Sequence, residues 1–105
     1  MIVMKFGGSS VRSADWINKV LDIAEQRLPA APLLISSAMG KTTDALVCIA
    51  EDAAAGRRES AFDRVAGLRR GHVEAAEELL TGSYREETVA RVGDLFDEMR
   101  SLVQG

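Results

Sequence analysis

Two short stretches of the chain are continuously apolar, at residues 2–4 and 33–35. The first is followed within a few residues by Gly7 and Gly8, and the second runs into the small polar segment 36–41. A short apolar run that ends in turn-forming residues is typical of a strand buried on both faces. The pattern therefore predicts two strands, each followed by a turn.

The periodicity changes between these two runs. From Ser13 to Pro29, apolar residues recur at intervals of three and four, with charged residues between them, which predicts an amphipathic helix. A strand, a helix and a second strand favour a right-handed βαβ unit with parallel strands. Both turns would then lie at the same edge of the sheet.

The rest of the chain is predicted to be helical, with breaks at Gly56 and around Gly82. Three helices are expected, over residues 43–55, 58–80 and 84–103. Ser83 and Glu86 have the spacing of a capping box, which would start the last helix. The predicted fold class is α/β, a parallel βαβ start followed by three helices.

A sheet of only two strands is marginal in water, and its open edges invite pairing. At 105 residues the chain forms at most one domain with a modest core. We therefore expect it to be the start of a longer α/β domain or to complete its sheet with a second copy of itself. A homo-oligomer is the expected assembly.

Composition and charge exclude several classes of protein. With 47% hydrophobic and 28% charged residues, the chain is neither disordered nor a membrane protein, and no run approaches the roughly 20 apolar residues of a membrane span. A net charge of -3 gives no field that would attract nucleic acid. The one cysteine, Cys48, allows no internal disulfide and favours a reducing compartment, so a cytoplasmic location is expected.

The first turn combines a cation with two adjacent glycines. Ligands of open α/β sheets bind beyond the carboxyl ends of the strands, where this turn is predicted. Gly7 and Gly8 can adopt backbone conformations closed to other residues and leave their amides uncovered, while Lys5 adds a positive charge. This combination suits a phosphate group. A solvated strand end followed by a plain turn is the alternative.

The second turn also favours an anion. It contains Ser36 and Ser37, and the helix that begins at Thr42 and Thr43 would present free amides and the positive end of its dipole. Two anions about 4 Å apart repel by roughly 4 kcal/mol at an effective dielectric constant near 20, so a cation is needed, and Lys5 is the candidate. Alternatively, Ser37 only bonds within the turn and Thr43 only caps the helix.

Other candidate sites are weaker. Gly40, Lys41 and Thr42 match the end of a P-loop, but Ile35 occupies the position where that loop requires glycine, so a P-loop is rejected. His72 has no ligand partners at metal-binding spacing and is predicted to be packed or solvated. Cys48 lies among aliphatic residues and is predicted to be a buried small hydrophobe. No metal site is predicted.

Residues 5–11, Lys-Phe-Gly-Gly-Ser-Ser-Val, resemble the opening of aspartokinases, as do residues 35–39, Ile-Ser-Ser-Ala-Met, and the pair Thr43 and Asp44. Members of this family have Lys-Phe-Gly-Gly-Thr-Ser-Val after their first strand, and Ser9 keeps the hydroxyl of that threonine. The resemblance implies the amino-acid-kinase fold, with residues 1–105 as the N-terminal portion of the domain and no regulatory domain.

The resemblance also implies a reaction and a set of site residues. The reaction is transfer of the γ-phosphoryl group of ATP, bound with Mg²⁺, to L-aspartate, giving 4-phospho-L-aspartate on the route to lysine, threonine and methionine. Lys5 would be catalytic and stabilise the transferring group. The phosphate end of ATP would contact Lys5, Gly7, Gly8 and Ser9. Ser37 would lie near the phosphoryl or aspartate group, and Thr43 would contact aspartate.

The family's later elements, including the glutamate and arginine that grip aspartate, have no counterpart in these residues. Because phosphoryl transfer depends on several positioned charges, the chain alone is predicted to have no measurable kinase activity. Another amino acid kinase, acting on glutamate, acetylglutamate, carbamate or a nucleoside monophosphate, is the nearest rival, and Phe6, Ser10 and Val11 argue against it. The alternative from another class is a non-catalytic helical module that self-associates or completes its sheet with a partner.

Overall fold

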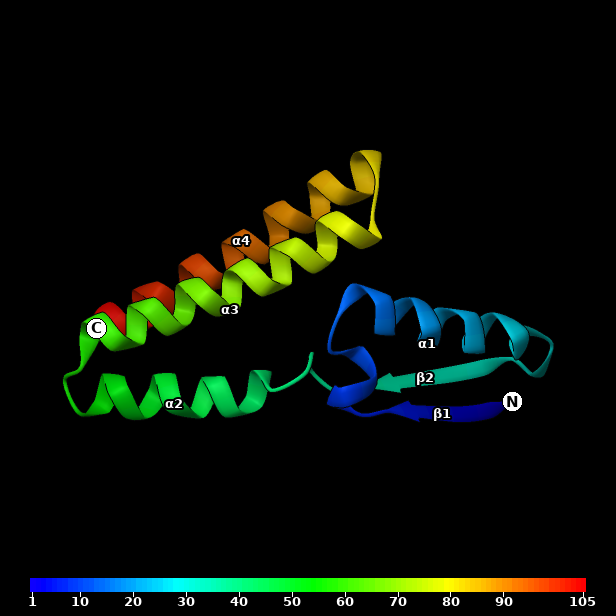
Figure 1. The fold of residues 1–105 in the computed structure, drawn as a ribbon, viewed down its shortest axis with the longest axis horizontal. Helices are drawn as coiled ribbons and strands as arrows, with labels where there is room; N and C mark the ends of the chain where they lie inside the picture. Colours follow the sequence, from blue (N-terminus) through cyan, green and yellow to red (C-terminus); the bar gives the residue numbers. More distant parts are fainter. The chain divides into compact units, whose positions relative to one another are not determined.

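The computed structural model describes all residues from Met1 to Gly105. The chain divides into two compact units, Met1–Thr42 and Thr43–Gly105 (Figure 1). No helix in either unit is both long enough and apolar enough to cross a membrane.

The first unit is a strand-helix-strand unit. Its elements in chain order are β1 (Ile2–Phe6), the 3-10 turn η1 (Gly8–Val11), α1 (Ala14–Gln26), the 3-10 turn η2 (Leu28–Ala30) and β2 (Pro32–Ser36). The strands are parallel and in register from the pair Ile2 and Pro32 to the pair Phe6 and Ser36. The predicted parallel βαβ start is therefore confirmed.

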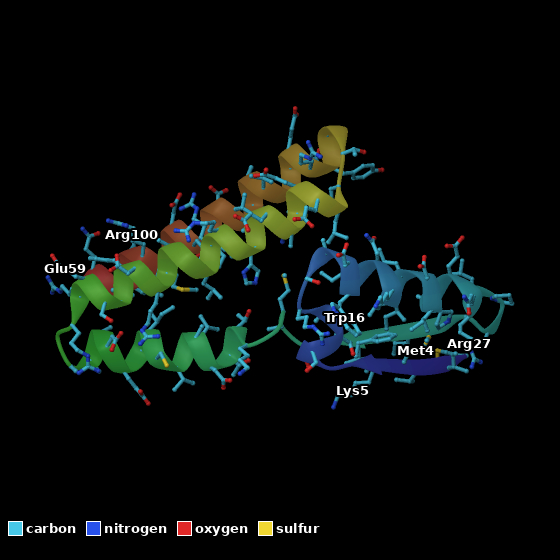
Figure 2. All side chains as sticks on the ribbon, in the orientation of Figure 1. Met4, Lys5, Trp16, Arg27, Glu59 and Arg100 are labelled. Atoms are coloured by element: carbon cyan, nitrogen blue, oxygen red, sulfur yellow. The ribbon has the colours of Figure 1, made fainter.

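Helix α1 covers one face of this sheet. Along β1, partly buried and exposed residues alternate, and Figure 2 shows Met4 on the side of α1 and Lys5 on the opposite side. The apolar residues of β2 are each about half exposed, with Leu33 at 51%, Leu34 at 45% and Ile35 at 47%. Val3 in β1 is 61% exposed as well, so the prediction of strands buried on both faces is wrong for both strands, because two strands and one helix leave the other face and both edges of the sheet uncovered.

Local interactions fix both ends of α1. Ser13 caps the N-terminus, and its hydroxyl accepts a hydrogen bond from the backbone N–H of Trp16 at 3.3 Å. At the other end, Ala31 adopts the left-handed conformation with φ of 50° and directs the chain back into β2. The helix therefore ends close to Pro29, as the sequence predicts.

The second unit consists of α2 (Thr42–Ala54), α3 (Arg58–Leu79) and α4 (Gly82–Gln104), with Thr42 itself in the first unit. The three predicted helices are confirmed to within two residues at each end. Helices α3 and α4 form a long antiparallel pair (Figure 1). Five buried side chains from the three helices form the core: Ile49, Ala61, Val65, Phe96 and Val103.

The predicted capping box at Ser83 is wrong. Helix α4 begins at Gly82 and its N-cap is Thr81, so Ser83 already lies inside the first turn. Only Leu80 and Thr81 separate α3 from α4, so α4 begins before the predicted cap. Arg85 instead holds the end of α3, since its guanidinium donates to the carbonyl oxygens of Leu80 and Glu77, each at 2.8 Å.

A buried carboxylate that the sequence did not reveal connects α2 to α3. The side chain of Asp52 is only 8% exposed and accepts hydrogen bonds from Ser60 Oγ at 2.7 Å and from Nε of Arg57 and Arg64, both at 2.9 Å. These bonds satisfy both carboxylate oxygens. Hydrogen bonds, first from Ser60 and then from Arg57, lower the pKa of Asp52 from 3.8 to about 2.

Because the folded pKa of Asp52 is depressed, its contribution to stability is present above the unfolded value of 3.8 and is lost as the pH falls toward about 2. The variant Asp52→Asn is expected to melt at least several degrees below the wild type at pH 7, and the difference should shrink between pH 4 and pH 2. Thermal unfolding followed by circular dichroism measures this. Asp63→Asn, which changes an exposed carboxylate on α3, is the control and should match the wild type at every pH.

Candidate functional site

The two turns that follow the strands are joined by backbone hydrogen bonds. The N–H of Ser37 donates to the carbonyl oxygen of Phe6 at 3.0 Å, and the N–H of Gly40 donates to that of Gly8 at 2.9 Å. The expectation that both turns lie at one edge of the sheet is therefore confirmed. We call residues 7–11 the first turn and residues 37–41 the second turn.

The first turn presents three consecutive free amides. Gly7 is the N-cap of η1, and the N–H groups of Gly7, Gly8 and Ser9 donate to no backbone or side-chain oxygen. The first amides of a helical turn lack an acceptor within it, so they are available to a ligand. Successive amides of this kind form a concavity that attracts oxyanions.

The structure explains the glycines at positions 7 and 8 differently from the sequence analysis. Gly7 has φ of -79° and neither it nor Gly8 lies in the left-handed region, so neither glycine uses the conformations closed to other residues that it can adopt. A Cβ atom on Gly7 would meet nothing within 4 Å, which leaves open space above this amide. A Cβ atom on Gly8 would lie 2.5 Å from the carbonyl oxygen of Gly40. The requirement at Gly8 is therefore close approach of the second turn.

Lys5 lies one residue before the end of β1, in register with Ile35. Its side chain is exposed on the sheet face opposite α1 (Figure 2), and none of the ion pairs in the structure involves it. The ammonium group is therefore not neutralised by any carboxylate of this chain. It has the charge and the freedom that a contact with an anionic ligand requires.

The remaining predicted residues divide between the two units. Ser9 and Ser37 are exposed and lie at this edge, in the first and second turns. Thr43 belongs to the second unit, where it is exposed in the first turn of α2 beside Asp44. The structure thus brings Gly7, Gly8, Ser9 and Ser37 to one edge of the sheet, with Lys5 in the strand that leads to it, and the roles of all six residues stay predictions.

Arg12 was missed by the sequence analysis. Its Nη1 donates to the carbonyl oxygen of Ser9 at 3.0 Å, and its guanidinium lies 3.6 Å from the centroid of the Trp16 ring. It has no acidic partner, so it is a second uncompensated cation beside the first turn. The i,i+4 spacing of Arg12 and Trp16 at the start of a predicted helix was the signal that could have revealed it.

His72 and Cys48 lie outside the two turns, in the second unit. Nδ1 of His72 lies 2.8 Å from the carbonyl oxygen of Leu68, and its ring packs 5.4 Å from that of Phe96, so the predicted packed histidine is confirmed. Cys48 is half-buried rather than buried, a small correction to its prediction. No group of three or more histidine, cysteine, aspartate or glutamate side chains is placed to hold a metal ion.

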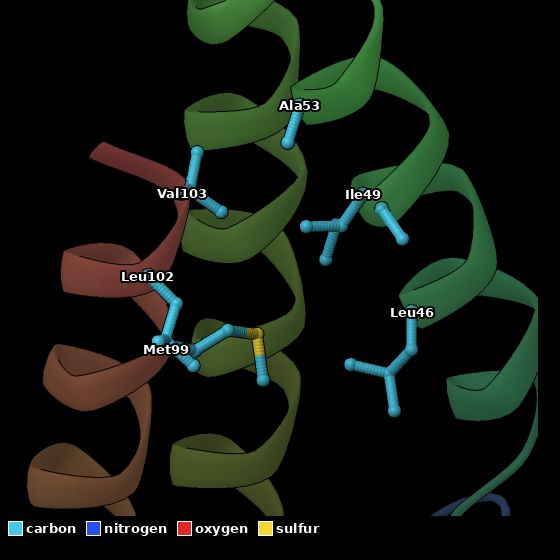
Figure 3. A pocket seen from close by; sticks show the side chains of 7 residues that line it. Leu46, Ile49, Ala53, Met99, Leu102 and Val103 are labelled. Carbon is cyan, nitrogen blue, oxygen red and sulfur yellow. The ribbon is translucent and has the colours of Figure 1, made fainter. Parts of the chain in front are cut away.

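The second unit contains an open apolar pocket of about 280 Å³ between α2 and α4 (Figure 3). It is lined by Leu46, Ile49, Ala50, Ala53, Met99, Leu102 and Val103. None of these side chains is polar, so the pocket could not orient or activate a charged substrate. The edge of the sheet is the better candidate for chemistry.

Comparison with known proteins identifies an aspartokinase-related region. A stretch of 51 residues is 47% identical to Aspartokinase 1, chloroplastic, and 45% identical to Aspartokinase 2, chloroplastic, both from Arabidopsis thaliana. The stretch is 49% of this chain but only 9% of either relative. No family model matches the chain. About half of the chain is thus related in sequence to aspartokinases.

Proposed function

We propose that residues 1–105 form the N-terminal portion of the amino-acid-kinase domain of an aspartokinase, whose complete form transfers the γ-phosphoryl group of ATP to L-aspartate. The observation that carries this proposal is the set of three free amides in the turn that follows β1, which is joined to a second turn by backbone hydrogen bonds. The sequence identity to two aspartokinases supports the same assignment.

The first turn would hold the phosphate chain of ATP. The amides of Gly7, Gly8 and Ser9 would donate to phosphate oxygens, and Lys5 would offset the charge of the transferring group. Preorganised donors of this kind stabilise developing charge because they need no rearrangement during the reaction. Ser37, on the second turn, would face the phosphoryl or aspartate group, and Thr43 would contact aspartate.

The residues of the two turns fit phosphate better than a metal ion. Mg²⁺ in phosphate sites is held by phosphate oxygens and one or two carboxylates, and neither turn contains a carboxylate. When bound, Mg²⁺ would neutralise charge on the phosphates of ATP. We also propose a homo-oligomer and a cytoplasmic location, although both relatives are named as chloroplastic proteins.

Gly7→Ala tests the phosphate site. We place it in a chimera in which this chain replaces the part of Arabidopsis Aspartokinase 1 that contains the 51 aligned residues. The variant should fold normally, because its φ suits alanine and the new methyl group meets no protein atom within 4 Å. A phosphate seated above the amide would meet that methyl group, so KM for ATP should rise about 10-fold or more, as for one lost interaction with a charged group.

Gly67→Ala is the matched control, since a Cβ atom on Gly67 in α3 also meets nothing within 4 Å. It should leave KM for ATP unchanged. Steady-state assays with varied ATP at saturating aspartate measure both variants. An inactive chimera, or equal KM values for the two variants, would contradict the proposed phosphate site.

A second candidate function is a non-catalytic module that self-associates through its helices. It is favoured by the exposed apolar side chains of α4, Leu95 at 59% and Leu102 at 76%. Multi-angle light scattering of the purified chain distinguishes the candidates when combined with the chimera assay. A stable dimer together with an inactive chimera would favour the module.

A further inference from the structure

The contact between Gly8 and Gly40 holds the two turns against each other. The carbonyl oxygen of Gly8 accepts a hydrogen bond from the N–H of Gly40, with an N···O distance of 2.9 Å. A Cβ atom on Gly8 would lie 2.5 Å from the carbonyl oxygen of Gly40 and 3.2 Å from that of Ala38. Both neighbours are backbone atoms, which cannot rotate away as a side chain can. Any side chain at residue 8 would therefore push the second turn away.

Gly40 contributes through its conformation. Its φ of 53° lies in the left-handed region, which glycine adopts without the steric penalty of other residues. A side chain at residue 40 would have room, since its Cβ atom would lie 3.6 Å from Cβ of Arg12, an ordinary van der Waals contact. The left-handed conformation accompanies the hydrogen bond from the Gly40 N–H to Gly8.

We infer that Gly8 and Gly40 are positioning residues that set the separation between the phosphate-binding first turn and the acceptor-binding second turn. The inference rests on the proposed function, because it assigns the two reactants to the two turns. Transfer between bound reactants requires reacting atoms about 3–3.5 Å apart, and a misplacement of about 1 Å can reduce the rate roughly 100-fold. Gly8 is suited to this role because its amide remains free for a phosphate while its carbonyl oxygen holds the second turn.

Hydrogen exchange of single amides tests the contact without any ligand. In the ¹⁵N-labelled chain, Gly8→Ala is expected to speed solvent exchange of the Gly40 amide at least 10-fold. The Ser37 amide, bonded to Phe6 in the same pair of turns, is the internal control and should change less than 3-fold. An unchanged exchange rate at Gly40 would overturn the inference, because residue 8 would then not hold the second turn. An equal acceleration at Ser37 would also overturn it, because the substitution would then loosen the whole sheet edge and not this contact.

A second measurement tests whether the contact couples the two turns. Sodium tripolyphosphate is the probe, and amide chemical shifts are the readout. In the wild type, signals of Gly7 and Ser9 should shift together with those of Ala38 and Gly40 at one midpoint concentration. In Gly8→Ala, the first-turn signals should shift while the second-turn signals stay unchanged.

The two measurements separate the inference from the proposed function. Wild-type shifts confined to the first turn would overturn the inference and leave the phosphate site standing. No shift at any amide would contradict the phosphate site in this chain, while the exchange rates at Gly40 and Ser37 would still decide whether Gly8 positions the second turn. Gly67→Ala is the control for both measurements, because Gly67 lies in α3 and is far from either turn in sequence. It should reproduce the exchange rates and the chemical-shift changes of the wild type.

Discussion

Replacing Lys5 with methionine is expected to lower kcat of the chimera with Arabidopsis Aspartokinase 1 by about 100-fold to 1,000-fold, the usual effect of removing one group that stabilises transition-state charge. Methionine keeps most of the side-chain length and removes the charge. The ammonium of Lys5 has no acidic partner, so its removal leaves no unpaired carboxylate behind. Stability should therefore change little while catalysis falls. Steady-state kinetics and thermal unfolding of the same preparation measure the two effects.

Lys19→Met is the matched control for this prediction. It removes the same charge from α1, where the ammonium lies 4.1 Å from the centroid of the Trp16 ring. Its kcat should stay within about 3-fold of the unmodified chimera, since an exposed cation outside the turns adds little to catalysis. If Lys5→Met and Lys19→Met had equal kcat values, Lys5 would have no catalytic role.

The largest effect on stability is expected at Phe96. Phe96 is 7% exposed in the core of the second unit, and its ring packs against that of His72. Phe96→Ala removes most of this buried ring and should lower the free energy of unfolding by about 3–5 kcal/mol. A small domain is stable by only about 5–15 kcal/mol, so the variant should be close to unfolding at 25 °C. Urea unfolding followed by circular dichroism at 222 nm measures the change.

Leu95→Ala provides the comparison, because it truncates the neighbouring side chain of the same helix, which is 59% exposed. Leu95→Ala should lower the free energy of unfolding by less than about 1 kcal/mol, since most surface substitutions have small effects on stability. Equal losses for Leu95→Ala and Phe96→Ala would mean that α4 does not present Phe96 to the core. If both were severe, loss of an assembly would be the better explanation, because alanine is the best helix former and neither change lowers helix propensity.

The elements of this fold were predictable because their signals are local. Two apolar runs ending in glycine or serine defined the strands, and the spacing of Trp16, Ile17 and Val20 defined α1. The parallel pairing followed from the single helix between the strands, since a parallel connection needs such a crossover. One of the errors was also local. Ser83 matched the capping-box pattern, but the two-residue connection from α3 placed the start of α4 before it.

The candidate site was only partly predictable. Its residue types followed from the motif after β1, yet the reason for Gly8 depends on Gly40, which lies 32 positions later and in contact only because the strands are parallel. Asp52 was invisible for the same reason. Its partners Arg57, Ser60 and Arg64 come from the following loop and helix. An aspartate in the sequence of α2 gives by itself no sign that its side chain is buried.

The sequence by itself therefore determined the order and type of the elements and the relation of about half the chain to aspartokinases, while the phosphate ligand of the first turn stays a prediction. These properties depend on residues close together in the chain, where spacing and side-chain chemistry are sufficient. Only the tertiary structure decided which amides remain free, which glycine is needed for close approach, and which carboxylate is buried. Those properties depend on distances between atoms of residues far apart in sequence, which the packing of strands and helices sets.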